Sequence, residues 1–288
     1  MSVTTDTRTR VANNIRRRAA RTGRAPRLAY AHYFIESDDL HSRIHLQNFY
    51  STFWPQVREP AVAHIFVHDA AGAPQGSVHR EIPPFGSLFL EVSDLLAKID
   101  SRAVEGIVAI DLEPAAEVRA QFHELPNAEE AEIKTPFWMA YYDDAESYMY
   151  VHSIDMLGGV VFGAPRLLTW LMTRQVALGK RWRSWRLLEV ERLSDLQVVC
   201  INHSPEARST VVGVYSADGS TTMYERSVSI GPLALERVCV PEEELASWPE
   251  RHPEIPHARI GLDPLLTGNG KPYVIMRYAA GPPSLHHG

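Results

Sequence analysis

The chain is poor in cysteine, in long apolar runs and in leader-like segments. Cys200 and Cys239 are its only cysteines in 288 residues, which excludes a disulfide-rich scaffold, although one bridge would form if the strands that carry them were neighbours. The longest apolar passage, residues 156–162, is interrupted by Gly158 and Gly159 and is too short to span a membrane. The N-terminus lacks the apolar segment of a secretory signal. We therefore expect a cytoplasmic protein with two buried thiols and no transmembrane segment.

The common catalytic motifs are also absent. The sequence contains no G-x-S-x-G, no Walker loop, no dinucleotide-binding glycine pattern, no H-E-x-x-H and no paired C-x-x-C. Asp143, Asp144 and Glu146 could supply an acid and a base, but YYDDAES is more typical of a hairpin turn. These absences favour a protein that is not an enzyme.

The composition is that of a globular protein with an uneven charge. Hydrophobic residues make up 45% of the chain and charged residues 22%, which is enough to build a substantial core. Residues 1–27 carry eight arginines and one acidic residue, Asp6, which gives this segment a net charge of +7. Because the net charge of the whole chain is -6, the remaining residues carry a net charge of -13. Such a basic arm can bind an anionic partner, such as nucleic acid or a membrane surface, or fold back on the acidic body.

Short apolar-alternating segments, separated by Gly, Pro, Asn and Asp, predict an all-β fold. In residues 43–49, for example, Ile44 and Leu46 lie on one face and His45 and Gln47 on the other. The predicted strands are 28–37, 43–49, 61–69, 77–82, 87–92, 106–114, 135–144, 147–153, 184–192, 196–203, 209–216, 221–229, 233–240, 258–263 and 271–279. We also expect a short helix at 93–99 and a loop at 242–257.

Residues 42–92 and 196–240 align as two copies of one unit. Asn48 falls against Asn202, Gly72 against Gly219, and Arg80 against Arg226. The repeat predicts an internal duplication, with two tandem antiparallel β-sandwich domains. The expected boundaries are a basic arm at 1–27, the first sandwich at 28–153, a connector with a short helix at 154–184, and the second sandwich at 185–288.

The second copy, VVCINHSPEARSTVVGVYSADGSTTMYERSVSIGPLALERVCV, resembles the sensory rhodopsin transducer family of small bacterial β-sandwich proteins. The shared features are a strand that ends in Asn202, a polar turn, a long alternating strand and a glycine turn, followed later by the strand PYVIMRY. The resemblance implies a non-catalytic, oligomerising, binding-type sandwich. This chain departs from the family in its two copies and its basic arm, so neither partner nor oligomer number can be transferred.

Histidines are concentrated in the first copy. If strands 43–49, 61–68 and 77–82 pair in one sheet, their histidines will cluster on its outer face, and His45 will lie across from His64. Three imidazoles, or two with Glu36 or Asp69, would suit zinc or another divalent metal. The alternative is a pH-sensitive polar face without metal. The histidines concerned are His45, His64, His68 and His79, with His45, His64 and His79 as the candidate ligands.

Four tryptophans, with tyrosines near them, could form a stacking platform for a sugar, or could fill the core and the interfaces instead. They are Trp54, Trp138, Trp182 and Trp185.

The leading hypothesis is a non-catalytic, cofactor-free binding or assembly module from a bacterium. It would bind a carbohydrate or a protein partner, or associate with itself. The alternative is a metal-assisted enzyme that uses the histidine face of the first domain.

Overall fold

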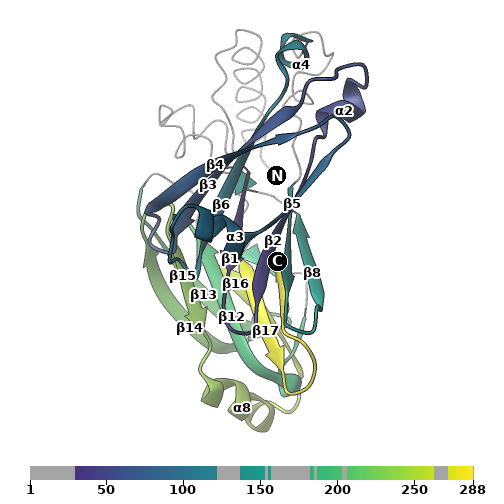
Figure 1. The fold of residues 1–288 in the computed structure, drawn as a ribbon. Coiled ribbons are helices and arrows are strands. Elements are labelled where there is room, and N and C mark those ends of the chain that lie inside the picture. Colours follow the sequence, from purple (N-terminus) through teal and green to yellow (C-terminus); the bar gives the residue numbers. More distant parts are fainter. Residues whose placement is uncertain are drawn as a thin grey trace, which may run out of the picture.

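A computed structural model of the chain describes residues 30–121, 137–152, 155–156, 182–184, 187–202, 206–262 and 272–287. The predicted basic arm, the predicted connector helix and Trp185 lie outside the described residues. The described part consists of four antiparallel sheets with few helices, so the predicted all-β class is confirmed. Figure 1 shows the first sandwich above and the second, green to yellow, below it.

The first sandwich packs a five-stranded sheet against a four-stranded one. The five-stranded sheet has the order β4 (Pro74–Ile82), β3 (Ala61–Asp69), β6 (Glu105–Glu113), β1 (Tyr30–Ile35) and β9 (Asp155–Met156). The four-stranded sheet has the order β5 (Ser87–Glu91), β2 (His41–Gln47), β7 (Phe137–Tyr142) and β8 (Tyr148–His152). Three short helices accompany them: α2 (Tyr50–Phe53), α3 (Val92–Lys98) and α4 (Ala116–Gln121).

The second sandwich repeats this plan. One sheet has the order β10 (Trp182–Arg183), β16 (His257–Leu262), β13 (Arg208–Ser216) and β14 (Thr222–Ile230), and β11 (Leu188–Glu189) also pairs with β16. The other has the order β15 (Leu235–Cys239), β12 (Leu193–Ile201), β17 (Tyr273–Tyr278) and β18 (Ser284–His287). A 3-10 turn (Val190–Arg192) and helix α8 (Glu242–Arg251) complete it.

Strand positions correspond between the two sandwiches. In both, the strand that directly precedes the aligned asparagine is second in its sheet. The hairpin that follows the asparagine in sequence, β3–β4 or β13–β14, forms the edge of the other sheet. The Asn48 side-chain amide donates to the carbonyl oxygens of Ile82 and Pro83, and Asn202 donates to the equivalent carbonyls at the end of β14. Each asparagine side chain therefore links the end of the preceding strand to the opposite sheet through hydrogen bonds.

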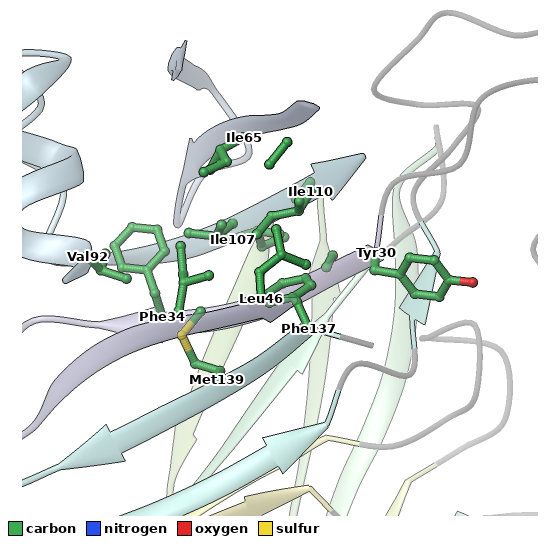
Figure 2. Packing of buried hydrophobic residues seen from close by; sticks show 14 of the residues in the cluster. Tyr30, Phe34, Leu46, Ile65, Val92, Ile107, Ile110, Phe137 and Met139 are labelled. Atoms are coloured by element: carbon green, nitrogen blue, oxygen red, sulfur yellow. The ribbon is translucent and has the colours of Figure 1, made fainter. Parts of the chain in front are cut away.

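Alternation of apolar side chains builds the first core. The predicted inward residues Ile44 and Leu46 are buried between the two sheets, because successive side chains in a strand point to opposite faces. Figure 2 shows Leu46 in one cluster with Phe34 of β1 and with Phe137 and Met139 of β7. The two faces predicted for residues 43–49 are thus confirmed.

The sheet β15-β12-β17-β18 contributes apolar side chains to two cores, one on each of its faces. One set of alternate side chains, including Val198 and Val274, lies in the second core. The other set belongs to the first core and joins the two sandwiches: Val199, Ile201, Leu235, Tyr273, Ile275 and Leu285. The contact between the sandwiches is therefore a continuous hydrophobic core.

Buried and partly buried polar contacts fix this junction. Arg237 of β15 forms an ion pair with Glu105 of β6 and donates to the Tyr33 hydroxyl at 2.8 Å. His32, which is fully buried, lies with its Nδ1 2.7 Å from the Tyr273 hydroxyl. Groups from β1 and β6 are thus paired with groups from β15 and β17, which leaves the two sandwiches little freedom to slide.

Three sequence predictions for the second half were wrong. Residues 184–192 do not form one long strand, because a 3-10 turn at Val190–Arg192 follows strand β11. Residues 242–251 form helix α8 rather than a loop, and the final strand β18 was not predicted. Segment 93–99 does form a helix, as expected.

The cysteines lie on neighbouring strands but do not face each other. Cys200 of β12 is opposite Glu236, and Cys239 of β15 is opposite Gln197. Both are free cysteines; Cys200 is buried, as predicted, whereas Cys239 is exposed. In the part of the chain that is described, no helix is long and apolar enough to cross a membrane.

Candidate functional site: an open aromatic face

The outer face of the sheet β5-β2-β7-β8 is lined by rings. Because the inward positions of these strands fill the core, the residues between them point to solvent. We call this surface the aromatic face; within these four fully described strands its one aliphatic side chain is Ala140. Its members are Ser87, Phe89 and Glu91 of β5; His41, Arg43, His45 and Gln47 of β2; Trp138, Ala140 and Tyr142 of β7; and Tyr148, Tyr150 and His152 of β8.

Three large rings are exposed around one histidine. Phe89 is 64% exposed, Tyr150 55% and Trp138 43%. His45 is directly opposite Phe89 on one side and Trp138 on the other. Its ring centroid lies 4.7 Å from that of Phe89 and 5.4 Å from that of Tyr150, both edge-to-face. The imidazole therefore fills the gap between the outer rings and makes one continuous platform.

Arg43 and Glu91 form the polar part of the face. Their side chains make an ion pair, and the Tyr142 hydroxyl donates to Glu91 at 2.7 Å. Arg43 also donates to the Tyr148 hydroxyl at 3.0 Å, with its guanidinium 5.0 Å from the Tyr142 ring centroid. Burial and the hydrogen bond to Glu91 raise the pKa of Tyr142. Both charges are thus neutralised within the face and are held against ring surfaces.

His45 is held in its neutral form. Its Nε2 atom is buried and has no hydrogen-bond partner in the part of the chain that is described. Burial, and then the charge of Arg43, lower the pKa of the imidazole below its ordinary value of 6.5. At neutral pH the centre of the platform therefore carries no charge.

The lowered pKa of His45 predicts a loss of stability on acidification. As pH falls below about 6.5, the unfolded chain takes up a proton at this site before the folded chain does, so the free energy of unfolding decreases. Chemical denaturation at about pH 7.5 and pH 5.5 should show a larger decrease for the wild type than for His45→Gln. Burial also lowers the pKa of His68, but that residue is present in both proteins. Equal decreases would contradict the prediction.

The corresponding face of the second sandwich is buried rather than open. There the strand equivalent to β2 is β12, and its outward residues Val199 and Ile201 are buried against the first sandwich. Ile275 and Leu285 extend that aliphatic surface on β17 and β18. The same sheet face is therefore buried against protein in the second sandwich and open in the first.

The structure describes the side chains of two of the four predicted platform tryptophans, and these two lie in different places. Trp138 is on the aromatic face, but Trp54 is 5% exposed and lines a pocket with Tyr50 and Ser51 that has room for about one water molecule. Trp182 is placed only as a backbone residue of β10, and Trp185 is outside the described residues. A sugar platform at these positions stays a prediction for Trp138.

The premise of the histidine cluster was wrong. Strand β2 belongs to a different sheet from β3 and β4, so His45 does not lie across from His64. His64 instead pairs with His79, with their Nδ1 atoms 2.7 Å apart, and its Nε2 lies 2.7 Å from Glu113. His68, on the same face of β3 as His64, is only 7% exposed.

The proposed carboxylate ligands have other partners. Glu36 accepts from the Ser42 backbone nitrogen, and Asp69 accepts from the Ala71 and Ala73 nitrogens. Among the described residues, no group of three or more His, Cys, Asp or Glu side chains is arranged to hold a metal ion. A metal at His45, His64 and His79 stays a prediction.

Sequence reasoning missed Phe89, Tyr150 and the Arg43–Glu91 pair. A signal was present in their spacing, because Tyr148, Tyr150 and His152 occupy alternate positions of one strand and so share a face. What the sequence did not indicate is which strands neighbour each other.

Comparisons with known proteins identify no family for the chain. No protein-family model matches it, and no curated protein matches it. Among solved structures, a beta-glucuronidase of glycoside hydrolase family 2 is similar, with 10% sequence identity and a TM-score of 0.19. The match covers 90% of this chain and 24% of the beta-glucuronidase chain. The match with a putative beta-galactosidase from Bacteroides fragilis covers 91% of this chain and 32% of that protein, with 11% identity and a TM-score of 0.20. The match with a calcium-binding mutant of Bacteroides uniformis beta-glucuronidase 2 covers 89% of this chain and 26% of that protein, with 13% identity and a TM-score of 0.19.

The chain thus spans between a quarter and a third of the length of these structures. Similarity at these TM-scores carries no argument about the fold or the activity of this chain.

Proposed function

We propose that the protein is a binding module that holds a carbohydrate on the aromatic face. The observation that carries the proposal is the open platform of Phe89, Trp138 and Tyr150 around a neutral His45, on a face with no aliphatic side chain larger than alanine. The equivalent face of the second sandwich is instead buried against the first sandwich.

The chemistry of the face suits a sugar. Sugar rings present C–H groups that pack on aromatic rings, and hydroxyls that need hydrogen-bond partners in the same plane. The face offers both, because Arg43, Glu91 and the tyrosine hydroxyls lie beside the rings. Glu91 is engaged by Arg43 and Tyr142, which supports a role in orienting a ligand rather than in acid–base catalysis.

Other features of the sequence hypothesis belong to this proposal. The internal duplication is supported by the corresponding strand positions and by the equivalent hydrogen bonds of Asn48 and Asn202. The likeness to sensory rhodopsin transducers, a cytoplasmic bacterial setting and self-association or a protein partner stay predictions. Binding of an anion by residues 1–27, and metal-assisted catalysis at His64 and His79, also stay predictions.

Electrophoresis in gels that contain a soluble polysaccharide tests the proposal. We expect hydroxyethylcellulose, xylan, glucomannan or a mixed-linkage glucan to retard the wild type, and Trp138→Ala to bind about tenfold more weakly or worse. Phe53→Ala is the matched control, because Phe53 is 51% exposed on α2, away from the aromatic face. Unchanged mobility in every gel, or equal losses in the two variants, would overturn carbohydrate binding at this face.

A further inference from the structure

The cross-strand register aligns rings in a row. We infer that the carbohydrate is a neutral, unbranched chain that lies across the strands, along Phe89, His45 and Trp138 toward His152; this inference rests on the proposed function. The four residues are directly opposite one another on β5, β2, β7 and β8. The row therefore runs perpendicular to the strands.

The length of the row determines the size of the ligand. Neighbouring strands are about 4.8 Å apart, so Phe89 and Trp138 are separated by about 10 Å, and Phe89 and His152 by about 14 Å. A single sugar ring cannot cover both Phe89 and Trp138. An extended β-linked chain can, because its alternate residues present the same face at a similar spacing, and about three residues would cover the row.

The row continues beyond the first sandwich. His152 is followed by His287 of β18, with ring centroids 4.7 Å apart, and the Leu285 backbone nitrogen donates to the Met149 sulfur of β8 at 2.8 Å. Strand β18, which belongs to the sheet β15-β12-β17-β18, thus lies beside the edge strand β8. A ligand longer than the row would meet the His287 ring there.

The charges beside the row favour a neutral ligand. Arg43 and Glu91 neutralise each other. At the far end of β2, His41 lies between the carboxylates of Glu36 and Asp144, at 3.3 and 3.4 Å. An anionic glycan would therefore compete with Glu91 for Arg43 and would approach two further carboxylates.

A proline-rich peptide is the main rival occupant, since such peptides also bind aromatic surfaces. They dock into grooves between rings. Here the space between Phe89 and Tyr150 is filled by the ring of His45, which contacts both edge-to-face. The surface is thus a platform, which suits a flat sugar chain better than a ridged peptide helix.

Titration calorimetry with a length series tests the inference. The probes are β-1,4-linked gluco-, xylo- and manno-oligosaccharides from disaccharide to hexasaccharide, oligogalacturonides as the anionic series, and a polyproline peptide. For the neutral series that binds, we expect Kd to fall about tenfold or more from disaccharide to tetrasaccharide. Phe89→Ala should remove most of this gain with length, whereas Trp138→Ala should weaken binding at every length.

Each other result has a defined meaning. Binding that is independent of length but lost in Trp138→Ala would overturn the row and leave the proposed function intact. Tighter binding of oligogalacturonides would overturn neutrality, and binding of the peptide alone would overturn both proposals. Phe89 is 64% exposed, so thermal unfolding of its alanine variant should match the wild type and exclude loss of fold.

Discussion

Replacing Gly72 with alanine should lower the free energy of unfolding by about 3 kcal/mol. Gly72 has φ +82° in the β3–β4 turn, a conformation that costs alanine about 1–2 kcal/mol. A β-carbon there would also lie 2.9 Å from the Ala234 nitrogen and closer still to the Pro232 carbonyl oxygen. Both belong to the second sandwich, whose Leu235 nitrogen donates to Ala70 beside this turn. Because these neighbours are backbone atoms, they cannot move aside as a flexible side chain can. The contact between the two sandwiches must therefore shift to make room for the β-carbon.

Gly281→Ala is the control for this prediction. Gly281 also has a positive φ, +108°, but a β-carbon there would have nothing within 4 Å. Its substitution should therefore cost only the backbone term, about 1–2 kcal/mol. Urea denaturation of both variants, followed by tryptophan fluorescence, measures the difference. Equal decreases in the free energy of unfolding for the two variants would mean that the β3–β4 turn is not in close contact with the second sandwich.

Replacing Trp248 with alanine should cost about 3–5 kcal/mol, a large part of the stability of an ordinary protein. Trp248 of α8 is 1% exposed and packs with Leu245 in the second core. Its indole nitrogen donates to the Ile255 carbonyl at 2.9 Å, and its ring lies 4.5 Å from that of His252. Truncation would remove both contacts and leave a cavity where the helix meets the sheet.

Trp138→Ala provides the comparison for Trp248. Because Trp138 is 43% exposed, we expect its loss to change the free energy of unfolding by less than about 1 kcal/mol while it weakens carbohydrate binding. Denaturation midpoints of the two variants, measured side by side, separate structural from ligand-binding tryptophans. A cost at Trp138 comparable to that at Trp248 would make the aromatic face a structural surface.

Strand faces could be predicted from the sequence because they depend on local alternation. Ile44 and Leu46 are buried and His45 is on the opposite face, as the pattern of residues 43–49 required. The alignment of Asn48 with Asn202 was also informative, since an asparagine that satisfies carbonyls at a strand end is kept at one position in each unit.

Strand neighbours could not be predicted, because alternation gives the face of a strand and not the sheet to which it belongs. His45 and His64 therefore looked like partners although β2 and β3 lie in opposite sheets. For the same reason Trp138 was a candidate while its neighbours Phe89 and Tyr150 were not. Helix α8 was missed despite three glutamates in its first turn, a helix-start signal that Pro249 obscured.

The sheet of the second sandwich that contributes to both cores limits how this architecture can be inherited. If recombination moved the second sandwich, from β10 onward, alone into another protein, Val199, Ile201, Ile275 and Leu285 would become a solvent-exposed patch. Such patches promote aggregation or indiscriminate binding. The first sandwich would lose the cover of β1 and β6 in the same event. The two units are therefore expected to be gained and lost together, as one inseparable evolutionary module.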